Sequence, residues 1–154
     1  MSESLSRGEL LQMAVTVEKG AETFYRTLAK RFKAYEKTFS RLGDDERAHA
    51  ETYSGLLGGK ATLSTESDRE IALSHIRAME SMGAIEFLKT AGGASKIDDL
   101  RSAVELAQKL ELNTLLLYQS LLLYFSGSDR EAIHKITDVE YIHLLQLSRM
   151  DYFE

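Results

Sequence analysis

The sequence predicts an all-α protein, a four-helix bundle with a long helical crossover between its second and third helices. The chain of 154 residues contains no Pro and is rich in Leu, Ala, Glu, Lys and Arg, a composition that favours long uninterrupted helices. Four segments also place apolar residues at alternating steps of three and four, which is the spacing of one helix face. This length suits a single domain with a sizeable core, which we expect to span residues 1–154.

The first two helices have recognisable end patterns. Ser6 followed by Glu9 forms a capping box, from which the first helix is expected to run to about Phe32. The second helix is expected to begin between Tyr35 and Ser40 and to end at Gly58–Gly59, because glycine commonly follows the last turn of a helix.

The crossover spans residues 60–94 and contains a further helix-start pattern, Ser67 with Glu70. It is too long for a tight turn and too apolar for a free linker. One or two short helices laid across the bundle fit better. A connection of this length lets the two helices that it joins run parallel.

The last two helices complete the bundle. The third is expected to start near Ser95, with Asp98 three residues later, and to run to Ser126–Gly127. The fourth opens with Ser128 and Glu131, a second capping-box pattern, and continues nearly to the C-terminus.

The two helical hairpins repeat one pattern. The first and third helices carry a Glu in an apolar seam and a Tyr seven residues later: Leu11, Ala14, Glu18, Ala21, Tyr25 and Leu28, then Val104, Ala107, Glu111, Thr114, Tyr118 and Leu121. The second and fourth carry Glu-x-x-His in such a seam: Phe39, Leu42, Glu46, His49, Tyr53 and Leu56, then Ile133, Ile136, Glu140, His143, Leu147 and Met150. The chain is therefore two copies of one hairpin, about 6–58 and 95–154, joined by a connector of about 59–94.

These seams direct four carboxylates and two imidazoles into one bundle core: Glu18, Glu46, His49, Glu111, Glu140 and His143. Burying an unpaired carboxylate costs several kcal/mol, and the seams hold no Lys or Arg to offset that cost. Two divalent cations would offset it, because their charges balance those of the four carboxylates. Oxygen and imidazole ligands in this number are typical of di-iron and di-manganese sites. The alternative is a set of surface stripes, but two Glu-x-x-His pairs in register with two seam Glu residues favour the metal site.

Composition excludes several other classes of function. The absence of Cys excludes disulfides, thiolate metal sites and cysteine nucleophiles. A net charge of −5, with "KRFK" (30–33) as the only basic cluster, argues against nucleic-acid binding. The most apolar run, 112–125, is shorter than the ~20 residues that span a bilayer, and the N-terminus lacks the apolar segment of a secretory signal. We therefore expect a soluble, cytoplasmic protein with neither a membrane nor a nucleic-acid partner.

Four stretches resemble the ferritin-like superfamily, and within it the rubrerythrin-type di-iron proteins: "EKGAETFY" (18–25), "DDERAHA" (44–50), "ELNTLLLY" (111–118) and "TDVEYIHLL" (137–145). The resemblance implies a ferritin-like bundle that holds two iron ions, with manganese as an alternative. It implies that one metal is bound by Glu18, Glu46 and His49 and the other by Glu111, Glu140 and His143. Either the Glu residues of the Glu-x-x-His pairs or the seam Glu residues would bridge the metals.

Three departures from the family pattern bear on function. Typical rubrerythrins carry a four-cysteine rubredoxin domain, and this chain has no Cys, so its electrons would come from a separate donor protein. Thr114 stands where the family has a further Glu that takes part in redox-linked metal movement, which argues against efficient peroxidase activity. Arg47 stands where bacterioferritin has its haem-ligating Met, so no haem is expected.

Three further residues are candidates for supporting roles. Tyr25 and Tyr118 are candidate catalytic residues that could donate hydrogen bonds to seam carboxylates or act as redox groups, although core packing explains them equally well. Asp45 could orient a metal-bound imidazole. A merely exposed Asp is favoured, because the matched position in the second hairpin is Val139.

The third helix is apolar well beyond its seam, at Leu115, Leu116, Leu117, Leu122 and Leu123. A helix that is apolar nearly all round is covered on both sides, so either the crossover or a second subunit packs on it. We expect a homodimer or a larger homo-oligomer.

The function that fits best is a non-haem di-iron oxidoreductase that reduces O2 or hydrogen peroxide. One alternative is a ferroxidase that passes iron to a storage shell. The other is a helical bundle that binds metal without catalysis.

Overall fold

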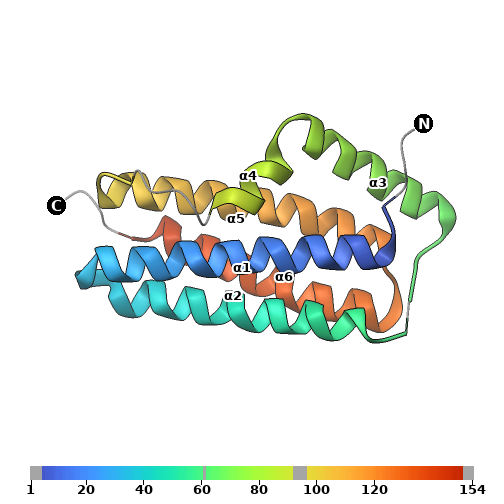
Figure 1. The fold of residues 1–154 in the computed structure, drawn as a ribbon, viewed down its shortest axis with the longest axis horizontal. Helices are drawn as coiled ribbons and strands as arrows, with labels where there is room; N and C mark the ends of the chain where they lie inside the picture. The colour runs from blue at the N-terminus through green and yellow to red at the C-terminus, as the bar shows by residue number, and fades with distance from the viewer. Residues whose placement is uncertain (1–4, 61, 92–96, 151–154) are drawn as a thin grey trace.

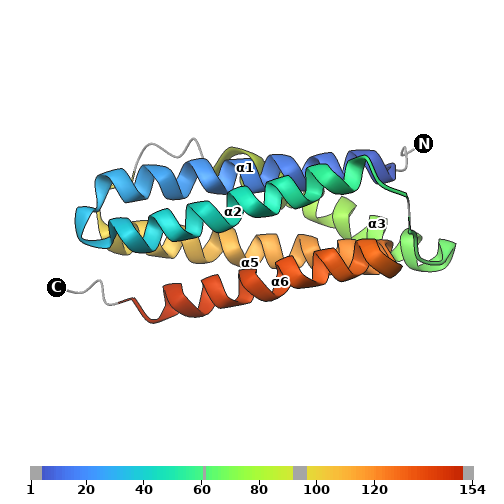
Figure 2. The same ribbon diagram turned by 90° about the horizontal axis from the view of Figure 1, so that it is seen from below.

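Four long helices lie side by side along the whole length of the molecule (Figures 1 and 2). The structure is a computed structural model that describes residues 5–60, 62–91 and 97–150. The four helices are α1 (Arg7–Arg31), α2 (Glu36–Leu57), α5 (Leu100–Tyr124) and α6 (Gly127–Ser148). A single 3-10 turn, η1 (Lys33–Tyr35), joins α1 to α2. The predicted all-α class is confirmed, since the described part of the chain forms no strand beyond one isolated bridge between Leu63 and Phe125.

The crossover contains two helices, α3 (Glu66–Ser81) and α4 (Ala84–Thr90). Because the crossover carries the chain back along the bundle, α2 and α5 run in the same direction, as predicted (Figure 1). None of the helices in the described ranges is long and apolar enough to cross a membrane.

The predicted ends of the first two helices are confirmed. The Ser6 hydroxyl accepts a hydrogen bond from the Glu9 N–H, and the Glu9 carboxylate accepts one from the Ser6 N–H, each at 3.1 Å. The helix α2 begins at Glu36, inside the expected range, and Gly58 is its C-terminal cap.

The predicted starts of α5 and of the crossover helix need correction. Asp99 caps α5, because its Oδ1 accepts a hydrogen bond from the Ser102 N–H at 2.8 Å. The expected start at Ser95 lies outside the described residues, and the helix begins at Leu100, after Asp98. In the crossover, α3 starts at Glu66 rather than Ser67, because Thr65 is the residue whose side chain caps it.

The predicted capping box at Ser128 and Glu131 is wrong. The helix α6 begins at Gly127, whose positive φ of 54° allows the tight turn after α5, and Ser126 takes the cap position. The N–H of Asp129 instead donates to the Thr62 hydroxyl at 3.2 Å. A residue of the crossover, rather than a neighbouring side chain, therefore accepts this hydrogen bond in the first turn of α6.

Asp129 also joins the ends of three elements at one end of the bundle. Its carboxylate lies 3.4 Å from the Arg7 guanidinium and accepts a hydrogen bond from the Thr62 N–H at 3.1 Å. Arg7 in turn donates to the Leu56 carbonyl at 2.6 Å. These contacts tie the start of α1, the end of α2 and the start of α6 together.

The crossover covers much of the apolar surface of α5, which is one of the two coverings expected from the sequence of this helix. The helix α3 packs on α5, and α4 packs against α1. Gly20 lies at the second contact, close enough that a Cβ there would stand 3.4 Å from the Leu88 carbonyl oxygen. Leu115, Leu117 and Leu122 are accordingly buried.

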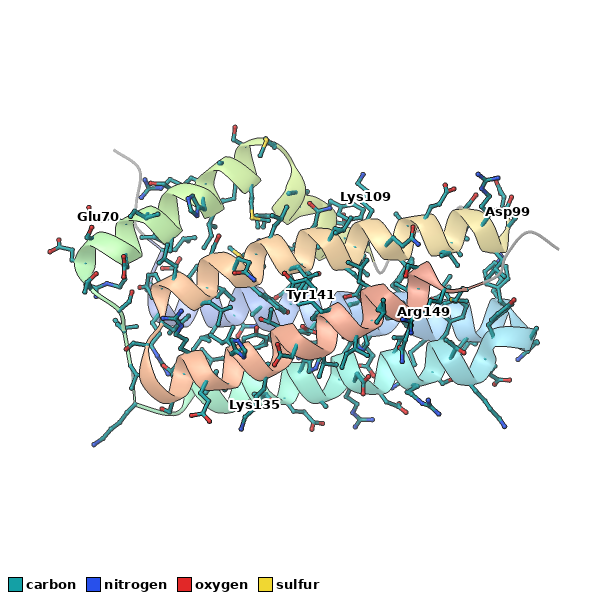
Figure 3. All side chains as sticks on the ribbon, turned by 180° about the vertical axis from the view of Figure 1, so that it is seen from behind. Glu70, Asp99, Lys109, Lys135, Tyr141 and Arg149 are labelled. Atoms are coloured by element: carbon teal, nitrogen blue, oxygen red, sulfur yellow. The ribbon has the colours of Figure 1, made fainter. Side chains whose placement is uncertain are left out.

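Leu116, however, is 58% exposed. Other large apolar side chains of α5 and α6 are also exposed: Leu112, Tyr141, Ile142 and Leu145. Figure 3 shows Tyr141 on α6.

Candidate metal centre

The four long helices bring all six predicted ligand residues into the bundle core. Their seam positions turn them inward, with one Glu from α1, one from α5, and a Glu and a His one turn apart from each of α2 and α6. Five of the six side chains are at most 1% exposed: Glu18, Glu46, Glu111, Glu140 and His143. His49 is the exception at 7%.

The six side chains form two overlapping groups of ligand atoms. The first group consists of Glu18, Glu46, His49 and Glu140, and the second of Glu46, Glu111, Glu140 and His143. Within each group the ligand atoms lie within 4.8 Å of one another. Glu46 and Glu140 belong to both groups, so the residues placed between the two positions are the Glu residues of the Glu-x-x-His pairs, rather than the seam Glu residues of α1 and α5.

Both imidazoles present Nδ1 to the carboxylates. His49 Nδ1 lies 2.8 Å from Glu140 Oε1, 3.4 Å from Glu46 Oε1 and 3.5 Å from Glu18 Oε2. His143 Nδ1 lies 3.3 Å from Glu46 Oε1 and 3.8 Å from Glu140 Oε2.

Several of these buried atoms lack a hydrogen-bond partner among the described residues: Glu18 Oε2, Glu46 Oε1, Glu111 Oε2, both oxygens of Glu140, and Nδ1 of His49 and His143. Buried polar atoms nearly always have a hydrogen-bond partner. Unpartnered carboxylate oxygens and imidazole nitrogens that meet at one place therefore indicate a cation-binding site. No Lys or Arg among the described residues forms an ion pair with any of them. The donor set therefore fits two divalent transition-metal ions.

Without cations, burial and the neighbouring negative charges disfavour the ionised form of Glu46 and Glu140. Burial raises the pKa of Glu46 well above its usual range, and the charges of Glu18 and Glu111 raise it further. Burial and the charges of Glu111, Glu46 and Glu18 do the same to the pKa of Glu140. Glu111 is the exception: burial alone would raise its pKa, but the interactions with Glu140, His143 and Tyr25 outweigh burial and lower it.

The two imidazoles also hold protons more tightly than a free histidine. Burial by itself lowers the pKa of His49, but the carboxylates of Glu140 and Glu18 outweigh it and raise the pKa to about 10. For His143, burial is again outweighed, by Glu111 and Asp45, so the pKa is raised. Protons and metal ions would therefore compete for these two imidazoles.

Two tyrosines bond directly to the seam carboxylates. The Tyr25 hydroxyl donates to Glu111 Oε1 at 2.6 Å, and the Tyr118 hydroxyl donates to Glu18 Oε1. Each bond joins α1 to α5, so these residues do more than fill volume. Burial raises the pKa of both phenols, which keeps them protonated as donors.

Tyr53 is a neighbour of the cluster that the sequence reasoning did not single out. Its ring centroid lies 5.5 Å from that of Tyr118, and its buried hydroxyl has no hydrogen-bond partner among the described residues. The pattern contained the clue, because Tyr53 follows Glu46 by seven residues, as Tyr25 follows Glu18.

The expectation that Asp45 is a merely exposed residue is wrong. Its side chain is 43% exposed, yet its Oδ2 lies 2.8 Å from His143 Nε2. This contact holds the outer nitrogen of the ring and leaves Nδ1 directed at the carboxylates.

Thr114, at the position where the resemblance implied a further Glu, is 2% exposed. Its hydroxyl donates to the Leu110 carbonyl of its own helix at 2.8 Å. It therefore packs as a core residue and offers no carboxylate to the cluster.

Comparison with known proteins agrees with this geometry. A family model described as rubrerythrin matches residues 9–150. Among solved structures, the chain is similar to the crystal structure of a Thermotoga maritima protein described as ferritin-like diiron-carboxylate, with 25% sequence identity and a TM-score of 0.67. That similarity covers 97% of each chain. No curated protein matches the sequence significantly.

Proposed function

The chain belongs to the rubrerythrin family and has the ferritin-like fold, and on this premise we propose that it is a non-haem di-iron carboxylate oxidoreductase that reduces O2 or hydrogen peroxide. The observation that carries the proposal is the pair of overlapping groups of buried, unpaired ligand atoms. The same ligand set suits manganese, which is the alternative metal.

The proposed ligand set has three parts: Glu18 and His49 on one metal, Glu111 and His143 on the other, and Glu46 and Glu140 shared between them. Iron bound in this way would supply the electrons and the Lewis acidity for reduction of the oxidant. Because Glu46 and Glu140 belong to both groups, they are the residues that would contact both metals.

The remaining residues of the site would hold the ligands in place. Tyr118 and Tyr25 each fix one oxygen of a seam carboxylate, which leaves Oε2 of Glu18 and Oε2 of Glu111 free to bind metal. The two phenols, which donate to these carboxylates, could also deliver a proton during reduction. Asp45 would keep the His143 ring in its binding orientation.

The electrons would come from a separate donor protein, because a chain without Cys cannot hold a rubredoxin-type iron site of its own. A homodimer or larger homo-oligomer is also part of the proposal. The exposed apolar side chains that support it are Leu112, Leu116, Tyr141 and Leu145.

The proposal is tested by loading the metal-free protein with Fe(II) under anaerobic conditions and then adding O2 or hydrogen peroxide. We expect about two iron ions per chain, with ferric absorption that appears as the oxidant is consumed. Glu46→Ala should abolish both, whereas Glu51→Ala, at an exposed position of the same helix, should change neither. Fewer than about one bound metal per chain, unchanged by Glu46→Ala, would instead identify a non-catalytic bundle. A very large particle that accumulates iron would identify a ferroxidase.

A further inference from the structure

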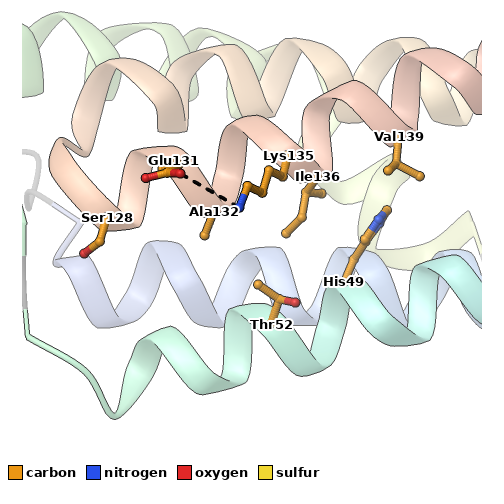
Figure 4. A pocket seen from close by; sticks show the side chains of 8 residues that line it. All are labelled: His49, Thr52, Ser128, Glu131, Ala132, Lys135, Ile136 and Val139. Atoms are coloured by element: carbon orange, nitrogen blue, oxygen red, sulfur yellow. Dashed lines mark ion pairs between the residues drawn. The ribbon is translucent and has the colours of Figure 1, made fainter.

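A surface groove between α2 and α6 leads to one end of the metal centre (Figure 4). Its volume is about 470 Å³, and we call it the His49 groove. It is lined by His49, Thr52, Ser128, Glu131, Ala132, Lys135, Ile136 and Val139. His49 is the only one of the six ligand residues among them.

His49 is also the ligand that solvent reaches. It is 7% exposed, whereas each of the other five is at most 1% exposed. Four other surface cavities over the described residues are lined by none of the six ligand residues. Among these five cavities, the His49 groove is the one that reaches a proposed ligand.

The difference between the two hairpins explains why one side is open. Asp45 lies against His143 Nε2 and covers the outer edge of that ring. The matched position beside His49 is Val139, which has no polar atom to offer. All the polar contacts that His49 makes within the described structure use Nδ1, so its outer edge faces the groove.

The lining of the His49 groove favours a small neutral molecule. At the mouth, Lys135 and Glu131 lie 3.8 Å apart and balance each other's charge. The inner wall, toward His49, is formed by apolar residues of α6, including Ile136 and Val139 (Figure 4). A charged substrate would lose hydration there without gaining a partner, whereas a neutral diatomic molecule would lose little and uncharged hydrogen peroxide would lose less than an ion.

We propose that the His49 groove is the route by which a small neutral oxidant reaches the centre, arriving first at the position held by Glu18 and His49. This inference rests on the proposed function, because it requires bound iron. It assigns different roles to the two halves of a duplicated site: the half with Asp45 is closed, and the half with Val139 admits the oxidant.

The test uses nitric oxide as a neutral diatomic probe and the Fe(II)-loaded full-length protein. Ala132→Phe and Thr52→Phe narrow the His49 groove from opposite walls, and neither residue is a proposed ligand. Thr38→Phe is the matched control, because Thr38 lines the other α2–α6 cavity. Stopped-flow absorbance gives the association rate, and iron content and helicity confirm that each variant is folded and loaded.

We expect both groove variants to bind nitric oxide roughly tenfold more slowly than the wild type, with unchanged iron content and final amplitude, and the control to bind at the wild-type rate. Unchanged rates in the groove variants, or equal slowing in Thr38→Phe, would overturn the entry route and leave the proposed function intact. A wild-type protein that binds no iron, or no nitric oxide once loaded, would refute the proposed function as well. If Ala132→Phe fails to load, Thr52→Phe, at an exposed position, decides the question alone.

Discussion

Replacing Asp45 should weaken one of the two metal positions and spare the other. The Asp45 carboxylate lies 2.8 Å from His143 Nε2, whereas the matched residue of the other hairpin, Val139, lines the His49 groove. Loss of such an outer partner typically lowers metal affinity by about 10- to 100-fold. Because the Asp45 side chain is 43% exposed, water can partly replace it, and we expect Asp45→Ala to fall near the lower end, roughly tenfold or about 1.4 kcal/mol.

The assay is a calorimetric titration of metal-free protein with Co(II) or Mn(II) in competition with a chelator, which resolves two binding steps. Asp44→Ala is the matched control, since Asp44 pairs with Arg26 at 2.8 Å on the outside of the same helix. We expect one weakened step in Asp45→Ala and two unchanged steps in the control. Equal weakening of both steps, or no change in either, would refute the idea that Asp45 positions His143.

Three other predictions follow from the same geometry. The pKa of His49, raised to about 10, means that the metal-free cluster holds a proton at neutral pH, and the raised pKa values of Glu46 and Glu140 act in the same direction. Metal affinity should therefore rise with pH and fall in acid, with proton release on binding. Calorimetry in buffers of different ionisation enthalpy checks this, and a pH-independent affinity would contradict it. If only the folded state binds metal, a free metal concentration of 100 times Kd should raise the free energy of unfolding by about 2.7 kcal/mol. A urea titration measures this increase, and adding a chelator should remove it. An unchanged unfolding midpoint would count against the site. Arg7→Ala leaves the buried Asp129 carboxylate without its cation. This variant should lower the free energy of unfolding by roughly 1–3 kcal/mol and leave the metal content unchanged. A loss of bound metal would contradict the purely structural role of this contact.

The six candidate ligands were predictable because they obey one local rule, the inward side of an amphipathic helix. The spacing of Glu18 and Tyr25, repeated at Glu111 and Tyr118, placed each residue on a seam without any knowledge of the tertiary structure. The length of the crossover likewise predicted the parallel course of the second and third helices, because it concerns connection length alone.

Features that depend on contacts between distant segments were not predictable in this way. Asp45 of α2 meets His143 of α6, so comparing it with Val139 at the matched position gave the wrong answer. At the start of α6, the Asp129 N–H donates its hydrogen bond to the Thr62 hydroxyl of the crossover, and no local pattern around Ser128 reveals this contact. The sharing of Glu46 and Glu140 between the two groups similarly depends on how all four helices come together.

The central claim is that two metals share the carboxylates of Glu46 and Glu140, and metal stoichiometry tests it most directly. Elemental analysis of Fe(II)-loaded protein should give about two ions per chain in the wild type. Glu18→Ala should remove only one ion, because Glu18 belongs to one group, whereas Glu46→Ala should remove both. Wild-type protein with fewer than one bound metal per chain, or equal loss from the two variants, would contradict the account.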